Sequence, residues 1–170
     1  MLLIRRLLIP CLAILLSACV EDLAPESKDI RNSDSFKIKI SENFNITTTT
    51  DEVISLEDEL ANNDAVVLYF TMWCTTCGGH MDEINYKSDS YPNIRFLMVD
   101  FISGSISQAK NYQRDNGYNN MTTLVDDDDI LQNTYDGKMA ATIVINNQSE
   151  IVFNEVYKSR LYDVLDSLNP

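Results

Sequence analysis

The sequence of 170 residues has little positive charge, because 13 lysines and arginines stand against 26 aspartates and glutamates and give a formal net charge of −13. An acidic excess of this size repels phosphate backbones and anionic lipid headgroups, which argues against nucleic acid as a partner. The sequence also has no internal repeat, and its length suits one globular domain with a hydrophobic core better than two. We therefore expect a single acidic domain that does not bind nucleic acid.

Metal-binding residues are also scarce, with four cysteines and one histidine in the whole chain. A structural zinc site needs four ligands and usually a second C-x-x-C or a histidine pair, and the sequence has neither. The acidic run Asp126–Asp129 lacks the spaced ligands and the closing glutamate of a calcium-binding loop, so we interpret it as a solvated turn. The sequence therefore favours neither a structural zinc site nor a calcium loop.

The amino-terminal segment lacks the run of roughly 20 apolar residues that a transmembrane helix needs. Its shorter apolar run at 7–16 follows two arginines and ends in small residues before Cys19, a pattern typical of a secretory signal. The ending "LSAC" resembles the lipobox of bacterial lipoproteins, in which the cysteine becomes the lipidated first residue. An ordinary signal peptide with an incidental cysteine is the alternative. We expect residues 1–18 to be a signal peptide and Cys19 to anchor the protein to a membrane of the bacterial cell envelope, facing the periplasm or the exterior.

The rest of the chain divides into a polar tether at 19–35 and one domain at 36–170. Within the domain, β-rich apolar runs predict strands and apolar residues at helical spacing predict helices. Ser55, with Asp58 three residues on, is the acidic variant of a helix-capping signature. The pattern predicts an α/β fold in which a mixed central sheet is flanked by helices and the chain ends in a β-hairpin and a carboxy-terminal helix. Predicted strands cover 36–40, 65–70, 94–100, 121–126, 140–146 and 150–156, and predicted helices begin near 55, 74, 105, 128 and 159.

The stretch "YFTMWCTTCGGH" at 69–80 places two cysteines three positions apart, where a buried strand passes into a helix. At a helix amino terminus, unpaired backbone N–H groups and the helix dipole stabilise a thiolate, so we expect the pKa of Cys74 to fall below the usual value of about 8.5. Cys77 lies one helical turn further on, and burial is expected to keep its pKa higher. In this interpretation Cys74 attacks a disulfide, and Cys77 resolves the mixed disulfide and releases the product.

The sequence "VVLYFTMWCTTC" resembles the active-site strand and turn of the thioredoxin superfamily, in which a tryptophan precedes the C-x-x-C. With the signal sequence, the chain looks most like the membrane-anchored, extracytoplasmic branch of thioredoxin-like and redoxin lipoproteins, and the resemblance covers about residues 55–168. It implies a thioredoxin-like fold and an enzyme, a thiol-disulfide oxidoreductase that exchanges disulfides with extracytoplasmic client proteins through Cys74 and Cys77. It also implies a membrane electron donor or acceptor and no bound organic cofactor.

Three positions are compared with the family pattern. Trp73 matches the family tryptophan, which helps to shape the docking surface, and packing in the core is the alternative. Leu68 stands where many members have a buried acid that relays protons, and Ala140 stands where members have a cis-proline. A cis peptide before a non-proline residue costs about 2.5–4 kcal/mol, so we expect the Met139–Ala140 bond to be trans. The missing proline weakens the case for a general peptide exchanger and favours a metal-binding alternative.

His80 is the only histidine and lies one helical turn beyond Cys77. One interpretation is that it relays a proton to or from Cys77, because the reference pKa of imidazole, about 6.5, suits that task. Glu83, a further turn along the helix, is a candidate for a similar part. The other interpretation is a partly exposed helix residue beside a polar site.

Copper binding is the main alternative to disulfide exchange. Thiolate and thioether sulfur are soft ligands that select Cu(I), so Cys74, Cys77 and His80 with one methionine would suit a metallochaperone-type lipoprotein. Core packing is the competing explanation for each methionine. An inert structural disulfide is disfavoured because so short a loop contributes little stability, and a peroxidase is disfavoured because the paired cysteines suit dithiol exchange. The candidate methionines are Met72, Met81 and Met139.

Overall fold

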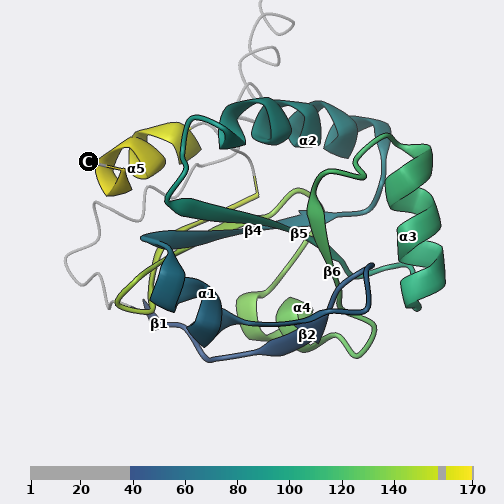
Figure 1. The fold of residues 1–170 in the computed structure, drawn as a ribbon, viewed down its shortest axis with the longest axis horizontal. Coiled ribbons are helices and arrows are strands. Elements are labelled where there is room, and N and C mark those ends of the chain that lie inside the picture. Colours follow the sequence, from purple (N-terminus) through teal and green to yellow (C-terminus); the bar gives the residue numbers. More distant parts are fainter. Residues whose placement is uncertain (1–38, 157–159, 170) are drawn as a thin grey trace, which may run out of the picture. The chain divides into compact units, whose positions relative to one another are not determined.

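The computed structural model describes residues 39–156 and 160–169, so the predicted signal peptide, the predicted lipidation site Cys19 and the tether lie outside the described residues. Within the described part, the strands form a six-stranded sheet in the order β1-β8-β7-β4-β5-β6 and a separate two-stranded one (Figure 1). No helix in this part is long and apolar enough to cross a membrane. The strands of the large sheet are β1 (Lys39–Ile40), β4 (Ala65–Thr71), β5 (Ile94–Asp100), β6 (Thr122–Val125), β7 (Thr142–Asn146) and β8 (Glu150–Glu155).

The large sheet is mixed, as the sequence predicted. β4, β5 and β6 run parallel to one another, whereas β7 is antiparallel to β4 and β8 is antiparallel to β7. β7 and β8 form the predicted hairpin around the turn at 147–149. Of the predicted strand at 36–40, only Lys39–Ile40 are described; they pair with the edge strand β8. Both of these residues are exposed.

Helices cover both faces of the sheet, as Figure 1 shows. On one face, α2 and α5 pack over a core that contains Val67, Tyr69 and Cys77. On the other face, α1, α4 and the β2–β3 hairpin cover a second core that contains Leu68 and Phe70. The helices are α1 (Leu56–Asn62), α2 (Thr75–Ser88), α3 (Ile106–Asp115), α4 (Ile130–Tyr135) and α5 (Leu161–Leu168), and the hairpin strands are β2 (Asn45–Thr47) and β3 (Val53–Ser55).

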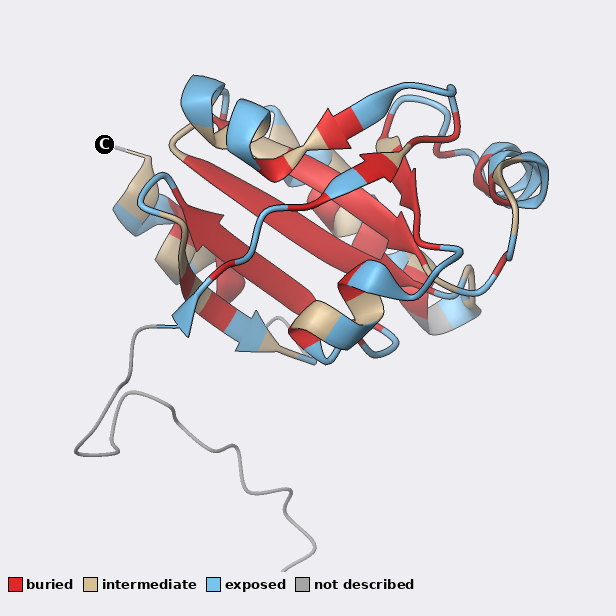
Figure 2. Ribbon diagram, turned by 90° about the horizontal axis from the view of Figure 1, so that it is seen from below, coloured by how far each residue is buried: buried red, intermediate tan, exposed pale blue. Residues whose placement is uncertain are grey.

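Strand β4 lies between β7 and β5, and all of its residues are buried (Figure 2). Its sequence "AVVLYFT" is continuously apolar up to the last position, which is what a strand covered on both faces requires. Because side chains alternate along a strand, Val67 and Tyr69 face the core under α2, while Leu68 and Phe70 face the opposite core. This alternation decides which β4 side chains can reach the cysteines.

The predicted helix starts are confirmed at two serines. Ser55 is the N-cap of α1, and its hydroxyl accepts a hydrogen bond of 3.4 Å from the main-chain N–H of Asp58. Ser105 caps α3 in the same way, accepting from the N–H of Gln108. The chain leaves α3 through Gly117, whose φ of 87° is a left-handed conformation that glycine adopts without strain.

The acidic run at 126–129 differs from the expected solvated turn at its first residue. Asp126 is 1% exposed, and its carboxylate accepts hydrogen bonds from the main-chain N–H groups of Leu131 at 2.9 Å and Gln132 at 2.8 Å. The expectation fails because this carboxylate satisfies the unpaired N–H groups at the start of α4. Residues 127–129 are exposed, as predicted.

Candidate active site

The two cysteines lie at the amino terminus of α2, where the chain leaves the carboxyl end of β4. Cys74 is the N-cap residue, and its Sγ accepts a hydrogen bond of 3.2 Å from the main-chain N–H of Cys77. The Sγ atoms of Cys74 and Cys77 lie 2.7 Å apart, and both cysteines are in the reduced, thiol form. This arrangement confirms that Cys74 starts the helix, and it aims a backbone donor at the sulfur that the sequence assigns as the nucleophile.

The two sulfurs have different environments. Cys77 is fully buried, whereas Cys74 is partly exposed. Burial raises the pKa of the Cys77 thiol, and its hydrogen bond with Cys74 raises this pKa further. The direction agrees with the sequence-based expectation for Cys77. A disulfide of an approaching molecule therefore meets Cys74 first, while Cys77 stays behind it as a neutral thiol.

Trp73 is held by three contacts. Its indole Nε1 donates a hydrogen bond of 2.7 Å to Asp100 Oδ2, and its main-chain N–H donates to Thr71 Oγ1 at 3.1 Å. Its ring lies 6.5 Å, centroid to centroid, from the ring of Tyr118. The backbone of Trp73 has a φ of 53°, an unusual conformation for a bulky side chain. Trp73 is half-buried against the core under α2, so it both packs and borders the cysteine pair.

Asp100 was not identified from the sequence. It lies at the carboxyl end of β5 and is 1% exposed, and its second oxygen accepts from the main-chain N–H groups of Ile102 and Ser103. The hydroxyl of Ser103 also donates to Asp100 Oδ2, the oxygen that binds Trp73. The sequence signal that could have found Asp100 is an acidic residue at the end of a strand with buried character. In the structure this strand, β5, runs parallel to β4, the strand before the cysteines.

His80 is 8% exposed, so the expectation of a partly exposed helix residue is wrong. The face of α2 that carries His80 packs on the sheet, where its Nδ1 lies 3.1 Å from the hydroxyl oxygen of Tyr69. The two rings are nearly perpendicular, at 84°. Glu83, one turn further along α2, is half-buried.

Tyr69 is the second residue that the sequence analysis missed. Burial, followed by the charges of ionised Cys77 and Cys74 and a side-chain interaction with Cys77, raises its pKa far above the usual value. Tyr69 therefore remains a neutral phenol between a thiol and an imidazole. Leu68, the position compared with the buried acid of the family, faces the opposite core. The sequence did contain a signal for Tyr69, because side chains alternate along a strand and every second residue of β4 therefore faces the cysteines.

The loop before β7 approaches the cysteines from the other side. The thiol of Cys74 donates to Met139 Sδ at 3.6 Å, which places the methionine beside this cysteine. The described residues contain no cis peptide bond, so the Met139–Ala140 bond is trans as expected. Ala140 takes a left-handed φ of 63°, and its N–H donates to the carbonyl of Phe70 at 2.9 Å. The loop is therefore attached to the end of β4.

Of the copper-binding set, Cys74, Cys77 and Met139 lie together, but His80 does not join the two cysteines. Among the described residues, no three or more His, Cys, Asp or Glu side chains are arranged to hold a metal ion. The physical reason is that His80 Nδ1 is directed at Tyr69. Of the candidate methionines, Met81 is buried and accepts a hydrogen bond from Thr71, and Met139 contacts Cys74.

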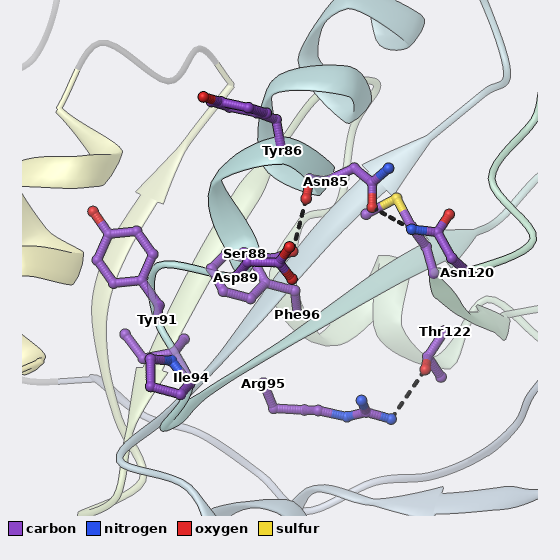
Figure 3. Close-up of a pocket in the computed structure, with 12 residues that line it drawn as sticks. Asn85, Tyr86, Ser88, Asp89, Tyr91, Ile94, Arg95, Phe96, Asn120 and Thr122 are labelled. Carbon is purple, nitrogen blue, oxygen red and sulfur yellow. Dashed lines mark hydrogen bonds between the residues drawn. The ribbon is translucent and has the colours of Figure 1, made fainter.

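A surface groove of about 640 Å³ lies elsewhere, between the carboxy-terminal half of α2, the start of β5 and the chain before β6 (Figure 3). Asn120 Nδ2 donates to Asn85 Oδ1 at 2.7 Å, and the guanidinium of Arg95 donates to Thr122 Oγ1 at 3.0 Å. The groove lining contains no cysteine or histidine. The groove is therefore separate from the dithiol, and nothing in its lining indicates catalysis.

Comparison with known proteins gives structural but not sequence matches. No protein-family model and no curated protein sequence matches the chain. A thioredoxin-like protein from Aeropyrum pernix superposes with a TM-score of 0.61 at 19% identity, over 74% of this chain and 89% of that one. The exposed lipoprotein thioredoxin Etrx1 from Streptococcus pneumoniae gives 0.61 at 19% identity, over 75% and 98%.

A candidate thiol:disulfide interchange protein DsbE from Chlorobium tepidum superposes with a TM-score of 0.63 at 16% identity, over 77% of this chain and 93% of that one. At these identities the likeness concerns the fold. It agrees with the mixed sheet, the terminal hairpin and the helices on both faces. The chain therefore has a thioredoxin-like fold.

Proposed function

We propose that the chain is a member of the thioredoxin superfamily and a thiol-disulfide oxidoreductase that exchanges disulfides with client proteins through Cys74 and Cys77. The observation that carries this proposal is the position of the pair: Cys74 caps α2 and is partly exposed, and the buried Cys77 sulfur lies 2.7 Å behind it. The thioredoxin-like fold of the solved neighbours supports the same chemistry. No bound organic cofactor is needed, because the two sulfurs carry the electrons.

The exchange takes two steps. The Cys74 thiolate attacks one sulfur of a client disulfide, so that a Cys74–client disulfide forms and the other client sulfur leaves as a thiolate. Cys77 then loses its proton and attacks Cys74 Sγ, which forms the Cys74–Cys77 disulfide and releases the second client thiolate. The client gains two electrons and the protein loses two. The same steps in reverse oxidise a client, with a membrane electron donor or acceptor restoring the pair.

Trp73 contributes to client binding in this proposal. It is half-buried and directly precedes Cys74, and its hydrogen bond to Asp100 fixes the plane of the indole. A fixed aromatic surface beside the nucleophile gives an extended client segment a place to dock. Met139, which contacts Cys74 from the opposite loop, is 45% exposed and borders the same site.

The proposed location is the bacterial cell envelope, with the protein anchored through lipid on Cys19 and facing the periplasm or the exterior. The signal pattern of residues 1–18 supports export, and disulfide exchange suits an oxidising compartment. One solved neighbour with a similar fold is itself described as an exposed lipoprotein. The clients are accordingly extracytoplasmic proteins with thiols or disulfides.

Reduction of insulin by dithiothreitol tests the proposed activity. We expect the wild-type protein to accelerate precipitation of the insulin B chain, and Cys74→Ser to remove the acceleration. Cys77→Ser should instead accumulate a stable mixed disulfide at Cys74, visible by mass spectrometry under non-reducing conditions. Wild-type protein that gives no acceleration, with Cys74 alkylated no faster than a free cysteine at neutral pH, would overturn the proposal.

A further inference from the structure

We propose that Tyr69 and His80 form a proton relay that deprotonates Cys77 during the resolving step. The inference rests on the proposed function, because it concerns the second half of the same exchange. It assigns a role to Tyr69, a residue that the sequence motif does not include.

The need for a base follows from the burial of Cys77. Only a thiolate attacks a disulfide, and Cys77 is fully buried with its pKa raised by that burial. Cys74 cannot take the proton, because its sulfur is already bonded to the client when Cys77 attacks. A group behind Cys77 that accepts the proton as the sulfur attacks therefore lowers the barrier of this step.

Tyr69 and His80 occupy the position of such a group. Both belong to the core side of the α2–sheet interface, and Tyr69 is 1% and His80 8% exposed. The Tyr69 hydroxyl oxygen lies 3.1 Å from His80 Nδ1, and the Tyr69 side chain belongs to the same buried cluster as Cys77, whose thiol interacts with it. With His80 protonated on Nε2 only, Cys77 donates to the phenol oxygen and the phenol donates to Nδ1.

The proton balance is complete within these three groups. As Cys77 Sγ bonds to Cys74 Sγ, the Cys77 proton moves to the Tyr69 oxygen and the Tyr69 proton moves to His80 Nδ1. The client sulfur leaves with the electron pair of the broken disulfide. Tyr69 is a neutral phenol before and after the step, which suits a buried tyrosine whose charged form is disfavoured. His80 ends as an imidazolium and later returns the proton to solvent.

Other titratable groups face this chain of three. Cys74 on α2 and Tyr118, which follows α3, act on Tyr69 through their charges when ionised. Glu83 lies one turn beyond His80 on α2 and is half-buried. Three charged groups on elements packed nearby have partners of their own. Asp82 accepts a hydrogen bond from Tyr118, and Asp166 accepts one from Tyr91. Arg160 forms an ion pair with Glu155.

The test separates the two steps of the exchange. Reduced protein is mixed in a stopped-flow instrument with less than one equivalent of 5,5′-dithiobis(2-nitrobenzoate). The first release of thionitrobenzoate reports attack by Cys74, and the second reports attack by Cys77. The second leaving group needs no proton, so its rate reports on Cys77 alone. Cys77→Ser should abolish the second phase, which confirms the assignment.

The variants are Tyr69→Phe, which removes the hydroxyl, and His80→Asn, whose side-chain oxygen replaces Nδ1 as an acceptor but takes up no proton. General base catalysis contributes about 10²–10⁴-fold, so we expect both variants to slow the second phase at pH 7 by at least about tenfold. The first phase should be unchanged in both. Tyr91→Phe is the control, because it removes a hydroxyl that donates to Asp166 from the same core cluster and should change neither phase.

The pH profile distinguishes a relay from a structural role. In the wild type, the rate of the second phase should reach a plateau below the pKa of Cys77 and fall at lower pH as His80 becomes protonated. In both variants it should rise about tenfold per pH unit without a plateau, as expected for attack by the small thiolate fraction. A plateau retained in either variant, or equal rates in the wild type and the variants, overturns the relay. A slow first phase in the wild type overturns the proposed function instead.

Discussion

The indole Nε1 of Trp73 donates a hydrogen bond of 2.7 Å to Asp100 Oδ2, so the residue before Cys74 is fixed by the end of the neighbouring strand. The two residues are 27 positions apart in the sequence. The contact ties the orientation of the Trp73 ring to a carboxylate that also accepts hydrogen bonds from the main chain after β5. It leads to the first of four predictions.

Asp100→Asn should release Trp73. If the amide oxygen of the new asparagine still accepts from the main-chain N–H groups of Ile102 and Ser103, its NH₂ group faces the indole N–H of Trp73. Two hydrogen-bond donors then face each other. An unsatisfied buried donor costs about 1–3 kcal/mol. Trp73 is the only tryptophan, so its fluorescence reports directly, and we expect its emission to move to longer wavelength with a matching loss of stability in urea. Asp166→Asn, at an exposed position, is the control and should leave the emission unchanged. A destabilised Asp100→Asn variant with wild-type emission would contradict the proposed link to Trp73.

Gly137→Ala should destabilise the loop that carries Met139. A Cβ at this position would overlap the ring of Phe70, which is fully buried in the second core. Overpacking of this kind costs about 1–3 kcal/mol of the free energy of unfolding, measurable by urea denaturation. Gly79→Ala is the matched control, because its Cβ would meet no atom within 4 Å on a helix surface. That change should stabilise the protein by about 0.5–1 kcal/mol. Equal effects of the two substitutions would show that the contact with Phe70 is not restrictive.

Asp126 should make stability fall with rising pH in its own titration range. Burial is the main cause that raises its pKa above the usual value, against the lowering effect of its main-chain hydrogen bonds. A carboxyl group with a higher pKa in the folded protein binds its proton more tightly there, so its contribution to stability is lost as pH rises from the unfolded pKa through the folded one. Asp126→Asn does not titrate. The stability of the wild type relative to this variant should therefore fall as pH rises above the usual titration range of an aspartate.

The control for this pH dependence is Asp128→Asn, at an exposed position of the same acidic run. Its stability should follow the wild type at every pH, measured as the free energy of unfolding in urea. A gap between the wild type and Asp126→Asn that stays constant over this range would show that the pKa of Asp126 is the same in the folded and unfolded chain.

Cys19→Ser should release the protein from membranes. The expected lipid is attached to this cysteine, so its removal eliminates the anchor while leaving the domain intact. Fractionation of expressing cells measures the result, and incorporation of labelled palmitate tests the modification itself. Cys11→Ser, within the predicted signal peptide, is the control and should leave membrane partitioning unchanged. Equal membrane fractions for Cys19→Ser and the wild type would reject lipid anchoring at this residue.

The sequence determined those features that depend on neighbours along the chain. The continuous apolar run of "AVVLYF" predicts a strand buried on both faces, and β4 is that strand. The position of Cys74 directly after it predicts a helix amino terminus, and Cys74 caps α2. Ser55 predicts a helix start for a similarly local reason, because its side-chain oxygen meets an N–H three residues on, and Ser105 caps α3 in the same way in the structure.

Only the tertiary structure decided which distant side chains meet at the site. Tyr69 contacts His80 because β4 turns its odd-numbered residues toward α2, and Asp100 reaches Trp73 because β5 lies beside β4 in parallel register. Asp126 is buried by α4, although the same run is solvated one residue later. Local pattern fixes where each element begins, but strand register and helix packing fix which of its faces meets another element. The partners of Cys77 and Trp73 therefore follow from the fold and not from the motif that contains them.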